Sequence, residues 1–83
     1  MDLVSLFLTG TQMIDLSSKG MRCRASRDLR TNQGMVRSFT EGIIQYEIEN
    51  LGRKLILVDW DNGLSSYVYP SEIAIIDGDL LGH

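Results

Sequence analysis

The stretch Leu55-Ile56-Leu57-Val58-Asp59-Trp60-Asp61-Asn62-Gly63-Leu64-Ser65-Ser66-Tyr67-Val68-Tyr69 decides the fold. Two β-rich runs flank the dipeptide Asn-Gly, which is the strongest short-range signal for a β-hairpin. A two-residue type I′ turn needs φ > 0 at both central residues, and Asn and Gly tolerate this conformation. With that turn, Trp60 faces Ser65 and Val58 faces Tyr67. One face of the predicted hairpin carries Ile56, Val58, Trp60, Tyr67 and Tyr69, and the other carries Leu55, Leu57, Asp59, Ser66 and Val68.

Two further strands are predicted before this hairpin. Residues 21–26 and residues 43–49 alternate between apolar and polar side chains, which is typical of half-buried strands. The first strand places its two arginines opposite its small apolar side chains. The side chains predicted to share the apolar faces of these strands are Met21, Cys23 and Ala25 in the first, and Ile44, Tyr46 and Ile48 in the second.

The remaining segments divide the chain. Residues 28–34 are polar and are predicted to form a long loop. Five short strands with Gly-containing turns and almost no helical period predict a small all-β, five-stranded barrel over residues 21–77. Residues 1–20 show no sustained period and are predicted to be an N-terminal extension, either flexible or paired with a sheet edge. Residues 78–83 form a polar tail.

The composition excludes several kinds of chemistry. The chain has 83 residues, enough for one small domain, with one Cys, one His and one Pro. These counts exclude a disulfide framework, a Cys/His zinc site and a Ser-His-Asp triad. Asp59 and Asp61 are expected to be solvated, so we expect no catalytic residue, metal or cofactor and no enzymatic activity. Residues 3–8 are apolar but too short to span a membrane, and they lack a signal-peptide pattern, so we expect a cytoplasmic protein without a membrane partner.

The formal charge of −3 is unevenly distributed. Residues 19–40 carry six bases and one acid, whereas residues 41–83 carry two bases and eight acids. Such an asymmetry indicates either a basic contact surface or opposite charges that pair across a sheet. The predicted partner-binding residues are Arg22, Arg24, Arg27, Arg30 and Arg37.

The hairpin also predicts a second interface. If Val58 and Trp60 belong to the core, Leu55, Leu57 and Val68 point outward. A cluster of exposed aliphatic side chains is unusual for a monomer and indicates a partner or a homo-oligomer. Strong curvature of a barrel is the alternative, because it would bury some of these side chains.

The pattern resembles an SH3-like barrel over residues 21–77. The resemblance rests on the arginine-bearing first strand, on Gly42, on residues 57–63 and 67–70, and on the closing Glu72-Ile73. Among SH3-like barrels, the sequence is similar to small bacterial and cyanobacterial accessory proteins. Examples are a small peripheral component of photosystem I, the variable chain of ferredoxin–thioredoxin reductase and the ferredoxin-docking component of photosynthetic complex I. These positions belong to the framework of the fold, so the resemblance implies no functional residue.

The resemblance and the charges together predict a non-enzymatic protein-binding module. Such a module would be an accessory or regulatory subunit that docks another protein through its arginines. The alternative is a nucleic-acid or ribosome-associated module similar to the KOW type, which residues 34–44 partly resemble and which would use the same arginines. The absence of aromatic residues interleaved with the arginines, and the net acidity, argue against single-strand binding.

Overall fold

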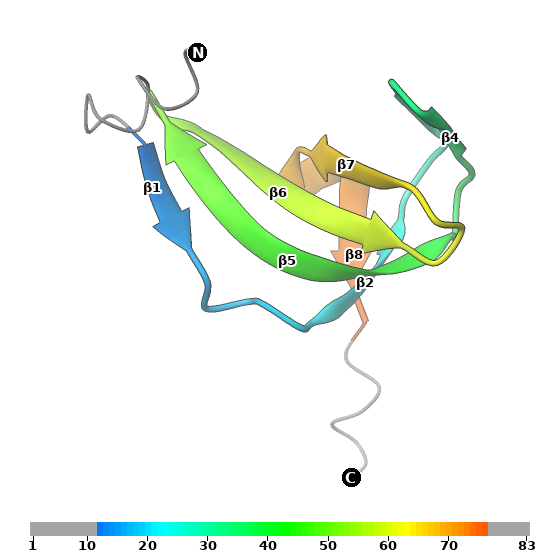
Figure 1. The fold of residues 1–83 in the computed structure, drawn as a ribbon, viewed down its shortest axis with the longest axis horizontal. Helices are drawn as coiled ribbons and strands as arrows, with labels where there is room; N and C mark the ends of the chain where they lie inside the picture. Colours follow the sequence, from blue (N-terminus) through cyan, green and yellow to red (C-terminus); the bar gives the residue numbers. More distant parts are fainter. Residues whose placement is uncertain (1–11, 77–83) are drawn as a thin grey trace, which may run out of the picture.

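β5 (Glu41–Asn50) is the longest of the described strands, and the other strands are arranged around it (Figure 1). The structure is a computed structural model, and it describes residues 12–76. β6 (Arg53–Trp60) pairs with one side of β5 along its length. On the other side, β2 (Arg22–Ala25) pairs with the beginning of β5, and β1 (Gln12–Asp15) pairs with its end. All of these pairings are antiparallel.

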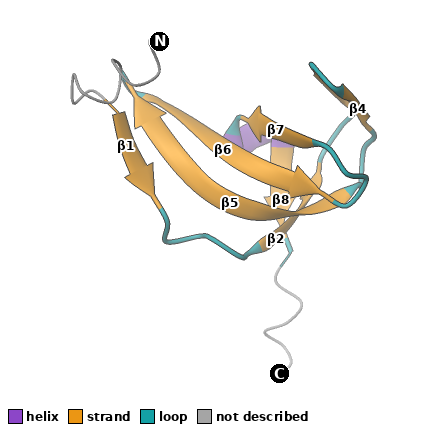
Figure 2. Ribbon diagram, viewed as in Figure 1, coloured by secondary structure: helices purple, strands orange, loops and turns teal. Residues whose placement is uncertain are grey.

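Two strands complete the larger sheet. β7 (Ser65–Val68) pairs with the far side of β6, and β8 (Ile73–Ile75) pairs with the far side of β2, so the strand order is β7-β6-β5-β2-β8. η1 (Pro70–Glu72) is a single 3₁₀ turn between β7 and β8, and it is the only helix among the described residues (Figure 2). The protein is therefore a small, compact all-β domain with antiparallel sheets, which confirms the predicted class.

A second, smaller sheet occupies the region that the sequence predicts to be a loop. β3 (Leu29–Thr31) and β4 (Gly34–Val36) form an antiparallel hairpin with a two-residue turn. The prediction of a long loop over residues 28–34 is therefore wrong. Leu29 and Val36 are 6% and 0% exposed, and they anchor the hairpin in the core. The polar residues between these two anchors concealed the hairpin, because each strand has only three residues.

The core lies on the inner face of the larger sheet. Val58 and Trp60 belong to it, as predicted. Gly42 allows β5 to cross closely over β6, because a Cβ atom there would lie 2.7 Å from the carbonyl oxygen of Asp59 and 3.0 Å from the Trp60 ring. The buried apolar residues are Cys23, Ala25, Leu29, Val36, Ile44, Ile56, Val58, Trp60 and Val68.

A β-bulge divides β5 into two halves. Ile44 pairs with Val58, but Tyr46 pairs with Leu57, so Gln45 is an extra residue in the ladder. An extra residue moves all later side chains of the strand to the opposite face. The prediction that Ile44, Tyr46 and Ile48 share one face is therefore wrong.

The loop between β6 and β7 has three residues rather than the predicted two. The Gly63 N–H donates to the Trp60 carbonyl (3.0 Å), the Trp60 N–H donates to the Leu64 carbonyl (2.7 Å), and Gly63 has a φ of 95°. A type I turn followed by a left-handed glycine is the usual three-residue hairpin loop. The Leu64 N–H also donates to the side-chain oxygen of Asn62 (3.0 Å), which stabilises this form of the loop.

The longer loop shifts β7 by one residue from its predicted register. Val68 pairs with Ile56, and Tyr67 pairs with Leu57. A shift of one residue exchanges the two faces of a strand. Val68 is therefore 2% exposed, whereas Tyr67 is 48% exposed. The prediction that Tyr67 and Tyr69 share a face with Val58 and Trp60 is wrong for the same reason.

The N-terminal part of the described chain lies against the end of β5. β1 pairs with residues 47–50, and the Gly20 N–H donates to the Ile44 carbonyl (2.8 Å). The apolar run over residues 3–8 and the predicted tail over residues 78–83 lie outside the described residues. The division of the chain at residue 21 stays a prediction.

Candidate partner-binding surfaces

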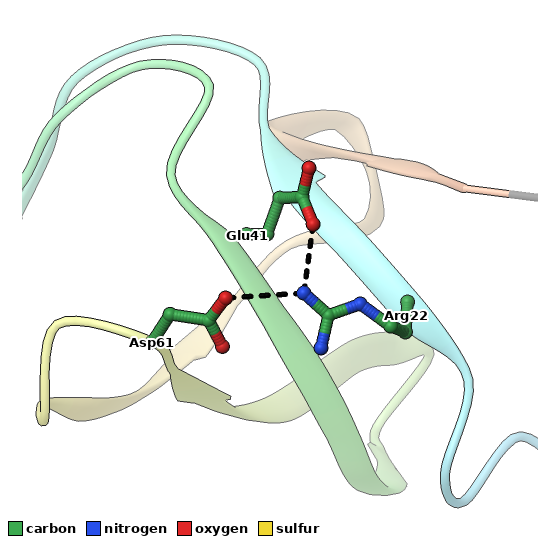
Figure 3. Close-up of polar contacts among 3 residues, drawn as sticks. All are labelled: Arg22, Glu41 and Asp61. Carbon is green, nitrogen blue, oxygen red and sulfur yellow. Dashed lines mark hydrogen bonds and ion pairs between the residues drawn. The ribbon is translucent and has the colours of Figure 1, made fainter.

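Arg22 holds three segments of the protein together (Figure 3). Its Nη2 atom lies 2.7 Å from Oε1 of Glu41 on β5 and 3.0 Å from Oδ2 of Asp61 in the loop after β6. The hydrogen bonds to Glu41 and then to Asp61 raise the pKa of Arg22 above its ordinary value. Both acids come from the acidic half of the chain, so at this position the opposite charges pair within the sheet.

Arg27 is also paired. Its Nη2 atom lies 2.8 Å from Oε2 of Glu72 in η1. The other carboxylate oxygen of Glu72 accepts the Tyr69 N–H at 2.8 Å, so Glu72 connects Arg27 to the beginning of η1. The Arg27 side chain is 67% exposed, and an exposed pair of this kind contributes little to stability.

The other three arginines carry charge that the described residues do not neutralise. Arg24, Arg30 and Arg37 are exposed, and within residues 12–76 none of them forms an ion pair. Arg24 lies on β2, Arg30 on β3, and Arg37 directly after β4. The guanidinium carbon of Arg24 lies 5.8 Å from the centre of the Phe39 ring, within the range of a cation–π interaction.

Phe39 has an unusual position. Its side chain is 71% exposed, and its φ is 70°, in the left-handed region that bulky L-residues rarely adopt. Two hydrogen bonds hold this turn against the end of β2: the Phe39 N–H donates to the Ala25 carbonyl (2.8 Å), and the Ala25 N–H donates to the Thr40 carbonyl (2.9 Å). Among the arginines of the described residues, the structure brings only Arg24 over the Phe39 ring; we refer to the set Arg24, Arg30, Arg37 and Phe39 as the basic surface. The sequence carries no signal for the place of Phe39, because turn geometry and not periodicity turns its ring outward.

The structure divides the three residues of the predicted aliphatic interface between the two faces of the sheet. Leu55 and Leu57 are half-buried on the outer face of β6, but Val68 belongs to the core, so its assignment to the interface is wrong. The shift of β7 explains this error, because it exchanges Val68 for Tyr67 on the outer face. The bulge in β5 adds Tyr46 and Ile48 to the same face. The outer apolar face consists of Ile14, Tyr46, Ile48, Leu55, Leu57 and Tyr67.

Two tyrosines are joined on this face. The hydroxyl groups of Tyr46 and Tyr67 lie 2.7 Å apart, and their rings meet edge to face with centres 6.3 Å apart. Partial burial, and then the hydrogen bond to Tyr46, raise the pKa of Tyr67 to about 12. Tyr67 is therefore neutral at physiological pH, and its ring is held in place across the sheet.

Cys23, Asp59 and Asp61 are the remaining side chains with reactive or ligating groups that the sequence singles out. Cys23 is fully buried, and this burial raises the pKa of its thiol to about 11, so it is an inert core residue, as predicted. Asp59 accepts a hydrogen bond from the Ser65 hydroxyl (2.7 Å), whereas Asp61 contacts Arg22. Among residues 12–76, no three acidic, His or Cys side chains gather as a metal site would require. In the same range, no helix has the length and apolar character needed to cross a membrane.

Comparison with protein-family models, with curated proteins and with solved structures finds no match for this chain.

Proposed function

We propose that the protein is a non-enzymatic binding module with the architecture of an SH3-like barrel, which docks an acidic region of another protein on its basic surface. The pairing of β2 with β8, the first and last strands of the predicted barrel, supports this architecture. The long β5, which bends at its bulge and pairs with three strands, supports it as well. Architecture alone does not define a function, so the proposal depends on the surface.

The observation that carries the proposal is the exposed, left-handed Phe39 with Arg24 and Arg37 beside it. Holding a bulky L-residue in a left-handed conformation costs roughly 1–2 kcal/mol, and the exposed ring of Phe39 recovers little of this by burial. Strained residues of this kind gather at functional sites, where the surrounding structure maintains them. Arg24 lies over the ring, and Arg37 begins the same turn. The combination of an exposed ring and cations that have no acidic partner within residues 12–76 suits a protein surface that presents carboxylates around an apolar contact.

The overall charge favours a protein over a nucleic acid. A chain with net charge −3 repels a long polyanion except at the basic surface. An acidic protein patch of similar size, in contrast, meets mainly that surface. One observation favours the nucleic-acid alternative: Phe39 is an aromatic ring beside Arg24, and bases stack on such rings.

A capture experiment tests the proposal. The double variant Arg24→Glu/Arg37→Glu is compared with wild type and with the control Lys19→Glu/Arg53→Glu, which changes the net charge equally at exposed positions outside the basic surface. Each chain is immobilised on a resin and incubated with an extract of the organism that encodes it. We expect wild type and control to retain the same partner, and the double variant to lose it. Equal capture by all three chains would contradict the proposal.

The same chains, together with the variant Phe39→Ala, distinguish the protein-binding module from the nucleic-acid module. Binding of labelled 15-nucleotide single strands is measured by fluorescence anisotropy from low to moderate salt. Tight binding that falls steeply with salt, and that Phe39→Ala weakens while the control does not, would favour the nucleic-acid module. We expect weak binding that is equal for all variants.

A further inference from the structure

β7 lies at one edge of the larger sheet, and no strand within residues 12–76 pairs with its outer side (Figure 1). Beyond this edge lie the β3–β4 hairpin and the segment that leads into it. Two adjoining hollows, of about 340 and 360 Å³, separate the hairpin side from β7. Both are lined by Arg30 and Thr31 on one side and by Ser66 and Tyr67 on the other. Together they form one groove along the edge of β7.

The hydrogen bonds identify which backbone groups of β7 face this groove. In an antiparallel pair, alternate residues direct both N–H and C=O away from the partner strand. The Ser65 N–H points to the groove side, where it donates to Gln33 Oε1 at 3.4 Å, and the Tyr69 N–H donates to Glu72 Oε1 at 2.8 Å. Tyr67 lies midway between Ser65 and Tyr69, so its N–H and C=O also point to the groove. Within residues 12–76, neither group of Tyr67 has a hydrogen-bond partner.

The groove is bounded at both ends. Gln33 reaches across it at the beginning of β7, and the ion pair between Arg27 and Glu72 lies at its far end. A strand of four residues spans about 13 Å, so the groove suits a short extended segment. The Arg30 side chain adds a positive charge on the hairpin side, and no carboxylate among the described residues pairs with it.

We propose that this groove binds an extended acidic segment of the partner, which adds a strand to the free edge of β7. The N–H and C=O of Tyr67 pair with the backbone of that segment, and Arg30 binds one of its carboxylates. In such strand addition the main chain provides affinity and the flanking side chains provide specificity. The inference rests on the proposed function, because it assigns a partner chemistry to the part of the basic surface that contains Arg30.

Amide hydrogen exchange, followed by NMR on the full chain, tests the inference. The probe is the blocked peptide (Val-Glu)₄, which has high strand propensity and regularly spaced carboxylates. In the free chain we expect Ser66 and Val68 to exchange slowly, because their N–H groups pair with β6, and Tyr67 to exchange quickly. Saturation with the peptide is expected to slow exchange at Tyr67 at least tenfold.

Two variants and their matched controls separate the backbone contact from the charge. Tyr67→Pro removes the groove-facing N–H without removing a bond to β6, and proline is tolerated at such edge positions. Tyr67→Ala is its matched control, since both variants lose the contact with Tyr46. We expect Tyr67→Pro to weaken peptide binding at least fivefold relative to Tyr67→Ala, and Arg30→Glu to weaken it similarly relative to Arg53→Glu.

Each contrary result has a distinct meaning. Binding that depends on Arg30 but leaves exchange at Tyr67 unchanged would overturn strand addition, although docking on the basic surface would stand. Slow exchange at Tyr67 in the free chain would show that the edge is already covered, and an increase of this protection with protein concentration would identify a second copy as the occupant; both overturn the inference. Absence of peptide binding also overturns it, whereas the proposed function is decided separately by the capture experiment with Arg24 and Arg37.

Discussion

Replacement of Leu51 by asparagine should stabilise the protein. Leu51 and Gly52 form the two-residue turn between β5 and β6, with φ values of 54° and 81°. These values fit a type I′ turn, for which Asn-Gly is the preferred sequence. Leu51 is 83% exposed, so it occupies a strained position with almost no compensating burial.

The magnitude follows from two opposing contributions. A left-handed conformation costs an L-residue roughly 1–2 kcal/mol, and asparagine avoids much of this penalty through its own local hydrogen bonds. Loss of the small buried part of the leucine side chain costs at most about 0.5 kcal/mol. We therefore expect the free energy of unfolding to rise by about 1 kcal/mol, which in a domain of this size raises Tm by about 4–8 °C.

Thermal and urea unfolding, followed by the fluorescence of the buried Trp60, measure the effect. Leu51→Ala is the control, because alanine removes the side chain but keeps the left-handed strain. It should leave the free energy of unfolding within about 0.5 kcal/mol of wild type. The reasoning is refuted if Leu51→Asn is no more stable than Leu51→Ala. In that case the left-handed conformation of Phe39 would not indicate a strained functional position either.

Three further predictions concern the core and the outer face. Ser66→Ala removes the acceptor of the buried Trp60 Nε1–H (2.9 Å) and should lower the free energy of unfolding by about 1–2 kcal/mol, whereas Ser65→Ala at the exposed end of β7 should change it by less than about 0.5 kcal/mol in the same urea titration. Burial raises the pKa of the Cys23 thiol from 9.0 to about 11, so the stabilisation from the neutral thiol is complete below pH 9 and is lost as the pH rises through about 11. Between pH 8 and pH 10.5, urea titrations should therefore show a larger loss in the free energy of unfolding for wild type than for Cys23→Ala. Equal losses would show that the thiol is not responsible. The homo-oligomer predicted from Leu55 and Leu57 should appear in light scattering and dissociate in Leu57→Asp, and a monomer in both cases would exclude it at the concentrations used.

The strands that alternate clearly could be predicted from the residues alone. Cys23 and Ala25 point inward because period-two patterning reports burial directly. Val58 and Trp60 could be assigned to the core for the same reason. The all-β class follows equally from local chemistry, whereas the left-handed Leu51 in the turn between β5 and β6 does not, because leucine disfavours this conformation. The uneven charge also follows from the sequence, although its pairing does not.

The sites depended on tertiary structure, because each involves segments that lie far apart in the chain. Whether an arginine binds a partner or belongs to the framework depends on the acids that the fold brings to it. Arg22 meets Glu41 and Asp61, whereas Arg24 meets Phe39. No local sequence pattern predicts these contacts.

The hairpin that decides the fold illustrates the division between sequence and tertiary structure. Its two strands and the Asn-Gly turn follow from the sequence, but two and three residues are both acceptable loop lengths for this signal. The Asn62 side-chain amide lies 3.4 Å from the carbonyl oxygen of Met35 in the β3–β4 hairpin, and the longer loop buries Val68 while leaving Tyr67 on the outer face. A side-chain period of two does not distinguish registers that differ by one residue, and the apolar character of both Tyr67 and Val68 makes either face plausible. Packing against the rest of the protein therefore selected the register, and with it the groove and both contact surfaces.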